Sequence, residues 1–220
     1  MSHSLHRYGT RENLKNDFCI YTRAARGVNR ENCGDKLRKT LEIYLSEAVV
    51  NFGSSHAGKC FLAGLKPEEY AKTLDNSYGI IATFADREAV KGVLRKAKEA
   101  ELGISTVVSG LIDDVVDIIH EVGLKPHTAL LSLGIHGKTS LLPEKEVLEF
   151  TTMCGHSLLA QNLVRSVVEK VKNGRLTIEE ASLILAKPCI CGIFNVKRCA
   201  GILAEKLKEC GCASNEEKGA

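Results

Sequence analysis

Tryptophan is absent from this sequence, and phenylalanine and tyrosine together make up only 5% of its 220 residues. The scarcity of aromatic rings argues against a surface for single-stranded nucleic acid, because such surfaces stack bases on rings. Charge of one sign is lacking too, since 30 basic residues face 27 acidic ones and the net charge is +3. Neither a nucleic-acid-binding stripe nor a membrane-binding patch is therefore expected.

Long apolar runs are also missing. No stretch approaches the roughly 20 residues that a membrane-spanning helix needs, and the segment from Met1 to Arg7 leads straight into polar residues. A signal peptide would need an apolar region there. We therefore expect a cytoplasmic protein with neither a membrane nor a nucleic-acid partner. The composition, 44% hydrophobic and 26% charged, is otherwise that of a globular protein with a sizeable core.

Cysteine is the residue in excess, with nine in the chain. Disulfide frameworks belong to short secreted chains. This chain has an odd number of cysteines, is expected to have no signal peptide and is long enough to build its own core. Metal binding or thiol chemistry is therefore the better explanation.

From residue 17 to 142 the pattern alternates between strands and helices. Short runs of apolar, β-branched and aromatic residues predict strands at 17–22, 79–85, 104–109 and 128–134. Apolar residues spaced three to four apart predict helices at about 37–48, 86–97 and 111–122. The glycines and serines of 51–60 predict a loop.

This order favours an α/β fold with a sheet of about four to five strands, mixed or mostly parallel. A ferredoxin-like α+β arrangement fits the same elements. The side chains that we expect to be buried on the central strands are Ile81, Val107, Val108 and Leu131.

From residue 143 onward only helices are predicted. Pro143 suits the first turn of a short helix, and a long helix follows at about 157–172. Thr177 and Glu180 form a capping box for the next helix, and Asn195 caps the last one. The predicted parts are an N-terminal arm (1–16), an α/β domain (17–142), a helical cysteine-bearing part (143–209) and a disordered tail (210–220).

Two turns in the helical part carry the best candidates for chemistry. The first, T-T-M-C-G-H, contains Cys154 and His156, and the second, P-C-I-C-G-I-F-N, contains Cys189 and Cys191. A helical hairpin between them could bring the thiols and the imidazole together. Each turn stands at a helix entrance, where free backbone N–H groups and the positive end of the helix dipole favour thiolate over thiol.

We expect these cysteines to hold an iron–sulfur cluster, most simply a [4Fe–4S] cluster, with Cys154, Cys189 and Cys191 as ligands. Cys199, one turn into the last helix, or His156 would complete the site. The cysteine spacing differs from that of zinc ribbons and of bacterial ferredoxins. A zinc site, redox thiols and purely structural cysteines therefore stay open as alternatives.

A second candidate site is G-I-H-G-K-T, which resembles the end of a phosphate-binding P-loop. Ser132 stands where a P-loop has its first glycine, and a proline shortly downstream means that no helix begins directly at Lys138 and Thr139. An enzyme that binds a nucleotide or phosphate ligand through Gly134 to Thr139 is an alternative function. His136, Lys138 and Thr139 could also bind an anionic substrate group beside the cysteine centre.

The M-C-G-H and P-C-I-C-G-I-F-N elements and the G-I-H-G-K-T-S-L-L-P stretch resemble a family of uncharacterised proteins from anaerobic prokaryotes, over the length from Ser4 to Leu203. The resemblance implies an anaerobic cytoplasm compatible with an iron–sulfur cluster, and it implies no substrate. The sequence thus predicts a cluster protein in redox or cluster-dependent catalysis, with a redox partner or a small anionic substrate. A non-enzymatic binding module stapled by zinc is the alternative, and a homo-oligomer is compatible with either.

Overall fold

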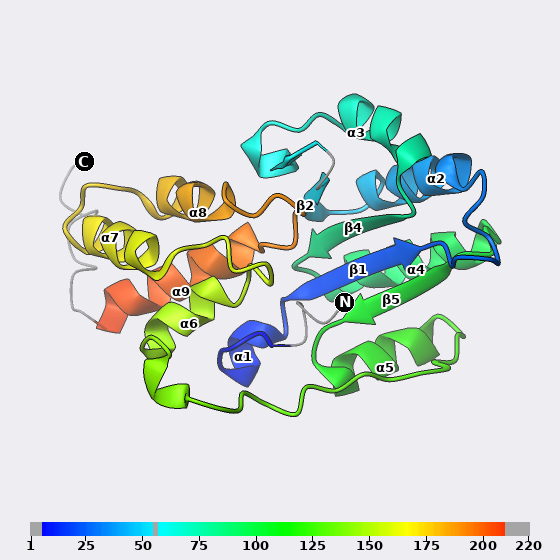
Figure 1. Cartoon of the computed structure of the whole chain (residues 1–220). Helices are drawn as coiled ribbons and strands as arrows, with labels where there is room; N and C mark the ends of the chain where they lie inside the picture. Colours follow the sequence, from blue (N-terminus) through cyan, green and yellow to red (C-terminus); the bar gives the residue numbers. More distant parts are fainter. Residues whose placement is uncertain (1–5, 55–56, 210–220) are drawn as a thin grey trace, which may run out of the picture.

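The computed structural model describes residues 6–54 and 57–209, which form a sheet with helices packed around it (Figure 1). The predicted tail 210–220, with Cys210 and Cys212, lies outside the described residues. The division of the chain into arm, α/β domain, helical part and tail stays a prediction.

Five strands form one sheet in the order β3-β2-β4-β1-β5, and every neighbouring pair is antiparallel. The strands are β1 (Phe18–Arg23), β2 (Val49–Ser54), β3 (Lys59–Cys60), β4 (Gly79–Phe84) and β5 (Ser105–Ser109).

The expectation of a mixed or mostly parallel sheet was wrong, and the α+β alternative describes the connectivity. Each β-α-β unit is split by a strand of the other unit: β4 lies between β1 and β2, and β1 lies between β4 and β5. Strands that run in the same direction are therefore never neighbours. This is the interleaved arrangement of the ferredoxin-like fold.

The helices surround this sheet and continue beyond it into the C-terminal part (Figure 1). In the described ranges they are α1 (Arg11–Leu14), α2 (Gly34–Leu45), α3 (Pro67–Thr73), α4 (Arg87–Glu99), α5 (Ile112–Glu121), α6 (Lys145–Thr151), α7 (Gln161–Lys172), α8 (Ile178–Ala186) and α9 (Val196–Glu209), with short 3₁₀ turns η2 (Phe61–Ala63), η3 (Leu74–Asn76) and η4 (Thr139–Leu141). The predicted class, an α/β or α+β sheet followed by a helical cysteine-bearing part, is confirmed.

Two local predictions were wrong. The predicted strand 128–134 has no regular structure, and all of its side chains are exposed. Strand propensity forms a strand only where a neighbouring strand supplies hydrogen bonds, and in the described chain none lies beside these residues. The predicted loop 51–60 instead contains the end of β2 and β3. Pairing of β2 with both β4 and β3 outweighs the local preference of its glycine and serine.

The two faces of the sheet pack against different parts of the chain. The apolar face carries Phe18, Ile20 and Phe84 and packs against α2, α4 and α5. Alternate residues point to the other face, which we call the cysteine face because it carries Cys19 and packs against the C-terminal helices and the cysteine-bearing turns.

Burial on the strands follows strand position. Ile81 on central β4 is buried, as predicted, whereas Val107 is 39% exposed and Val108 is only half-buried because β5 lies at the edge of the sheet. Leu131 is 64% exposed because its predicted strand does not form. The predictions for Val107 and Leu131 were therefore wrong.

The helix caps of the C-terminal part agree with the sequence. Thr177 and Glu180 form the capping box of α8, and the side-chain oxygen of Asn195 accepts a hydrogen bond from the backbone N–H of Arg198 at the start of α9. The long helix α7 begins at Gln161, a few residues later than predicted. None of the described helices combines the length and apolar character that crossing a bilayer requires.

Candidate thiol centre

The second cysteine turn begins where α8 ends. The backbone N–H of Cys189 bonds to the carbonyl of Ala186, and the N–H of Gly192 bonds back to the carbonyl of Cys189 at 3.3 Å. Gly192 has a φ of +77°, a left-handed conformation that glycine adopts without steric cost. The chain therefore reverses within the C-x-C motif, so that Cys189 and Cys191 point to the same side instead of opposite sides.

This turn brings the thiols close together. The Sγ atoms of Cys189 and Cys191 are 3.9 Å apart, and the Sγ of Cys191 lies 3.5 Å from Nδ1 of His156 in the first turn. The Cys154 thiol, from the same turn as His156, interacts with Cys189, and each shifts the pKa of the other. The contacts thus run in one chain from Cys154 through Cys189 and Cys191 to His156. The three thiols are buried and the imidazole is exposed.

Backbone N–H groups near the three sulfurs favour their charged forms. The N–H of Phe194 acts to lower the pKa of Cys189, and the N–H of Ile193 acts to lower that of Cys191. The N–H groups of His156 and Leu158 act in the same direction on Cys154. Such groups favour a negatively charged sulfur, because donors to the charged form stabilise it.

The three thiols differ in the direction of their pKa shifts. The hydrogen bond from Cys189 lowers the pKa of Cys191 below its usual value despite burial. Cys154 also lowers the pKa of Cys189, but the interaction with Cys191 and burial outweigh this and raise it to about 12. Hydrogen bonding to Cys189, followed by burial, raises the pKa of Cys154 well above its usual range. Cys191 is therefore the thiol that ionises first.

The second turn is pressed against strand β2. A Cβ on Gly192 would overlap the backbone of Phe52, and a Cβ on Gly53 would lie 2.7 Å from the carbonyl carbon of Cys191. Two glycines that face each other therefore let the two backbones meet. Gly53 was assigned to a loop from sequence, and this close approach is the reason for a glycine within the strand.

Polar side chains of the cysteine face bind the carbonyls of this turn. Thr83 donates to the carbonyl of Gly192 at 3.0 Å, and Asn51 donates to the carbonyl of Phe194 at 3.1 Å. Arg7 donates to the carbonyl of Ile193 between them, at 2.5 Å. Consecutive buried carbonyls are thus each paired, which holds the turn in one position on the sheet.

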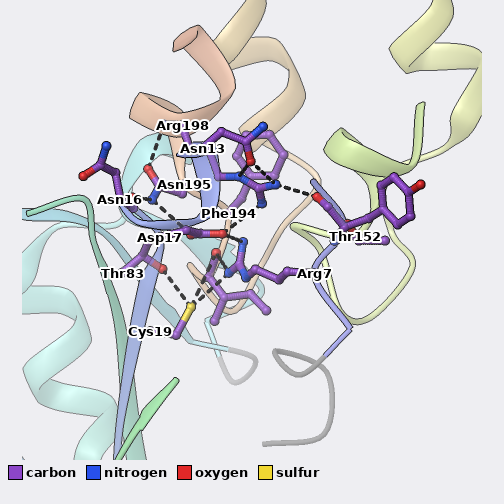
Figure 2. Close-up of polar contacts among 12 residues, drawn as sticks. Arg7, Asn13, Asn16, Asp17, Cys19, Thr83, Thr152, Phe194, Asn195 and Arg198 are labelled. Atoms are coloured by element: carbon purple, nitrogen blue, oxygen red, sulfur yellow. Dashed lines mark hydrogen bonds and ion pairs between the residues drawn. The ribbon is translucent and has the colours of Figure 1, made fainter. Parts of the chain in front are cut away.

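A buried charge cluster adjoins the turn, as Figure 2 shows. The carboxylate of Asp17 lies 3.0 Å from Arg7 and 2.9 Å from Arg198, and it accepts a hydrogen bond from Asn195 at 3.0 Å. Arg198 also donates to Asn13. Two guanidinium charges face one carboxylate, so the cluster carries one excess positive charge.

The excess charge lies on the side of the cysteines. Nη2 of Arg7 donates a hydrogen bond to the Sγ of Cys19 at 2.9 Å (Figure 2). Nη1 of Arg7 is buried and, although it lies 3.0 Å from Asp17, it has no aligned hydrogen-bond acceptor among the described residues. Cys189 also contributes to the electrostatic environment of Arg7. A buried cation in this setting stabilises negative charge on nearby sulfur.

The other predicted site residues lie apart from this chain of contacts. Cys199 is buried in α9, where burial raises its pKa to about 12 although Ser182 and Arg198 act to lower it. His136, Lys138 and Thr139 are exposed, no strand precedes them in the described segment, and only the short turn η4 begins at Thr139. The geometry of a P-loop is therefore not formed there.

Sequence reasoning missed the residues that position the second turn: Arg7, Asp17, Asn51, Gly53 and Thr83. The charged and polar residues among them carry no local motif. A weak signal existed at Asp17 and Cys19, because a charged residue and a cysteine flank the apolar start of a buried strand.

Among the described residues, no group of three or more cysteine, histidine, aspartate or glutamate side chains already has the arrangement of a metal site. The four side chains of the thiol centre form an open chain of contacts and not a closed shell. Comparison with family models, curated proteins and solved structures found no match for this chain. Its function must therefore be inferred from the chemistry of this centre.

Proposed function

We propose that the protein binds a metal centre through the thiolates of Cys154, Cys189 and Cys191, with the imidazole of His156 as the remaining ligand. The observation that carries the proposal is the contact geometry of the two cysteine turns, in which the Sγ of Cys191 lies 3.9 Å from that of Cys189 and 3.5 Å from Nδ1 of His156. Nearby backbone N–H groups also favour the thiolate form of the three cysteines, and a metal-bound thiolate keeps negative charge that such donors stabilise.

The contact distances support a single tetrahedral ion such as zinc. Metal–sulfur bonds of about 2.3 Å and metal–nitrogen bonds of about 2.0 Å at tetrahedral angles space two sulfurs about 3.8 Å apart and a sulfur and a nitrogen about 3.5 Å apart. The observed separations are 3.9 Å for Cys189 and Cys191 and 3.5 Å for Cys191 and His156. Closing the shell requires that Cys154 and His156 turn toward the same point as Cys189 and Cys191.

An iron–sulfur cluster is the second candidate. It is favoured by the excess positive charge of Arg7, Arg198 and Asp17, because hydrogen bonds and nearby charge tune such anionic clusters. A cubane cluster needs the thiolates farther apart, because each binds a different iron. In this case the centre would serve electron transfer or cluster-dependent catalysis, with a redox partner or a small anionic substrate.

Metal analysis of protein purified without oxygen tests the proposal. Stoichiometric zinc in a colourless protein supports the single ion, and a brown protein with iron and acid-labile sulfide in equal amounts supports the cluster. The substitutions Cys154→Ser, Cys189→Ser and Cys191→Ser should each lose the metal. Cys33→Ser is the matched control, because Cys33 is buried on the other side of the sheet and donates to the carbonyl of Ser77.

The fourth ligand is tested separately. His156→Ala should weaken metal binding in competition with a chelator, whereas Cys199→Ala should leave the metal content unchanged. The reverse result would assign Cys199 as the ligand. Folded wild-type protein that contains neither zinc nor iron, even after reconstitution under reducing conditions, would refute the metal centre.

A further inference from the structure

A long exposed segment, which we call the free segment, connects the two halves of the chain at residues 127–142. Every residue in it is exposed, and six of them are large and apolar: Leu130, Leu131, Leu133, Ile135, Leu141 and Leu142. Leu133 is 86% exposed and Leu141 is 75% exposed. Monomeric proteins rarely leave such a contiguous apolar patch in water, and larger ones mark interaction sites.

The free segment has the composition of a strand but makes no strand in this chain. Its stretch Thr128–Ile135 reads T-A-L-L-S-L-G-I, which predicted a strand from sequence. Within the described residues no backbone hydrogen bond ties residues 128–133 to another strand. Within the segment, the carbonyl of Leu133 contacts His136 and the N–H of Gly134 bonds to the hydroxyl of Ser132. These local bonds involve single groups, so the backbone from 128 to 133 is not paired with any described strand.

The sheet has an edge strand, β5, to which such a segment could add. Strand β5 is the last in the order and pairs only with β1, so among the described strands its other edge has no partner. Val107, on β5, is 39% exposed. A strand at the edge of a sheet is a template for an added strand.

Charge is complementary between the two surfaces. The chain from 123 to 142 contains Lys125 and Lys138 and no acidic residue. Helix α5, which directly follows β5, carries Asp113, Asp114, Asp117 and Glu121. Asp113 pairs with Arg11, and Glu121 pairs with Arg87 and Lys91. An added free segment would bring its lysines toward Asp114 and Asp117, and the attraction would favour this edge over a nonspecific apolar contact.

We propose that two copies of this chain form a two-fold symmetric dimer in which the stretch Thr128–Ile135 of each copy adds as a strand to the β5 edge of the other. A second copy is the occupant that these observations favour, because each copy supplies both a free strand and an open edge. A reciprocal exchange satisfies both at once, as a closed two-fold interface requires. The proposal does not depend on the metal centre.

Light scattering of the full chain across a concentration series tests the dimer. The wild type should be a dimer that dissociates on dilution. Leu133→Lys on the segment and Val107→Lys on the edge should each raise the dissociation constant of the dimer about tenfold or more. A tenfold rise corresponds to a loss of about 1.4 kcal/mol of binding free energy. Val28→Lys is the control, because Val28 is 81% exposed in a different loop, and it should leave the dimer unchanged.

Mixing the two variants identifies the geometry. In a mixed dimer the segment variant keeps an intact β5 edge and the edge variant keeps an intact segment, so one of the two contacts is restored. Equal amounts should therefore form more dimer than either variant alone. Hydrogen exchange should also show protection of amides at 128–133 and along β5 that is lost in Leu133→Lys.

Three outcomes would overturn the proposal. The first is a wild-type chain that is monomeric at every concentration. The second is a dimer that survives both Leu133→Lys and Val107→Lys. The third is rapid amide exchange at 128–133 within an intact dimer, which would mean that the copies associate elsewhere.

Discussion

The apolar face and the cysteine face of the same sheet are built by different physics. On the apolar face, rings and aliphatic side chains such as Phe18 and Phe84 pack against helices that follow in sequence. On the cysteine face, Thr83, Asn51 and Arg7 donate hydrogen bonds to individual carbonyls of a turn more than 100 residues away. The first face tolerates many apolar side chains, whereas the second requires particular donors at particular places.

The difference explains where the thiol centre lies. Apolar packing has no direction, so it can hold helices together without fixing one atom to within a fraction of an ångström. Hydrogen bonds to consecutive carbonyls fix the position of the second turn, and that turn sets the separation of Cys189 and Cys191. The following substitutions ask whether stability and metal binding divide between the two faces in this way.

The largest effect is expected on the apolar face, from Phe84→Ala. Phe84 is fully buried, so the substitution removes apolar contacts and leaves a cavity that should lower the free energy of unfolding by about 4 kcal/mol. Denaturant unfolding measures the loss. If the faces are separate, folded variant protein should keep its metal. Loss of metal under conditions where the variant is folded would contradict the division.

Asp17→Asn acts on the cysteine face. It leaves the buried charges of Arg7 and Arg198 without a carboxylate, which should cost about 3 kcal/mol of unfolding free energy. Asp113→Asn is the control, because the pair of Asp113 with Arg11 is exposed and its loss should change stability by less than about 0.5 kcal/mol. Similar losses in the two variants would mean that Asp17 is not the neutralising group.

Thr83→Val and Thr22→Val make the same chemical change on the two faces of the sheet, so their effects can be compared directly. Thr83 bonds to the carbonyl of Gly192 on the cysteine face, and Thr22 bonds to Tyr44 and Thr106 on the opposite face. Each substitution leaves a buried partner unpaired and should cost about 2 kcal/mol. Only Thr83→Val should speed the transfer of metal to a chelator. Equal transfer rates would show that the bond to Gly192 does not position the cysteines.

The smallest effect is expected at the surface pair of Glu144 and Arg165, which joins the start of α6 to α7. Hydrogen bonds from Arg165 lower the pKa of Glu144 to about 2. Because the folded-state pKa is depressed, the stabilisation is present above the unfolded pKa of about 4.3 and is lost as pH falls toward 2. A carboxyl titration by NMR should show the low midpoint, and Arg165→Met should restore an ordinary one. An ordinary midpoint in the wild type would mean that solvent screens the pair.

Local signals in the sequence were reliable where one segment contains the whole cause. The capping box of Thr177 and Glu180 and the cap at Asn195 depend on neighbours within three residues, and both form as predicted. The turn containing Cys189 and Cys191 was likewise identified, because a proline, a glycine and a helix cap surround it. Prediction failed at 128–134 and 51–60, where the outcome depends on whether another strand lies alongside.

The sequence by itself determined the fold class, the main helices and the two cysteine-bearing turns, because apolar periodicity, caps and glycines act within a few residues. Only the tertiary structure decided that neighbouring strands are antiparallel, that Cys199 is buried in α9 and not in the chain of contacts of the other thiols, and that Arg7 reaches Cys19. These outcomes depend on which distant segments meet. Burial makes these contacts energetically important, because a buried charge or carbonyl that lacks a partner within the protein costs free energy.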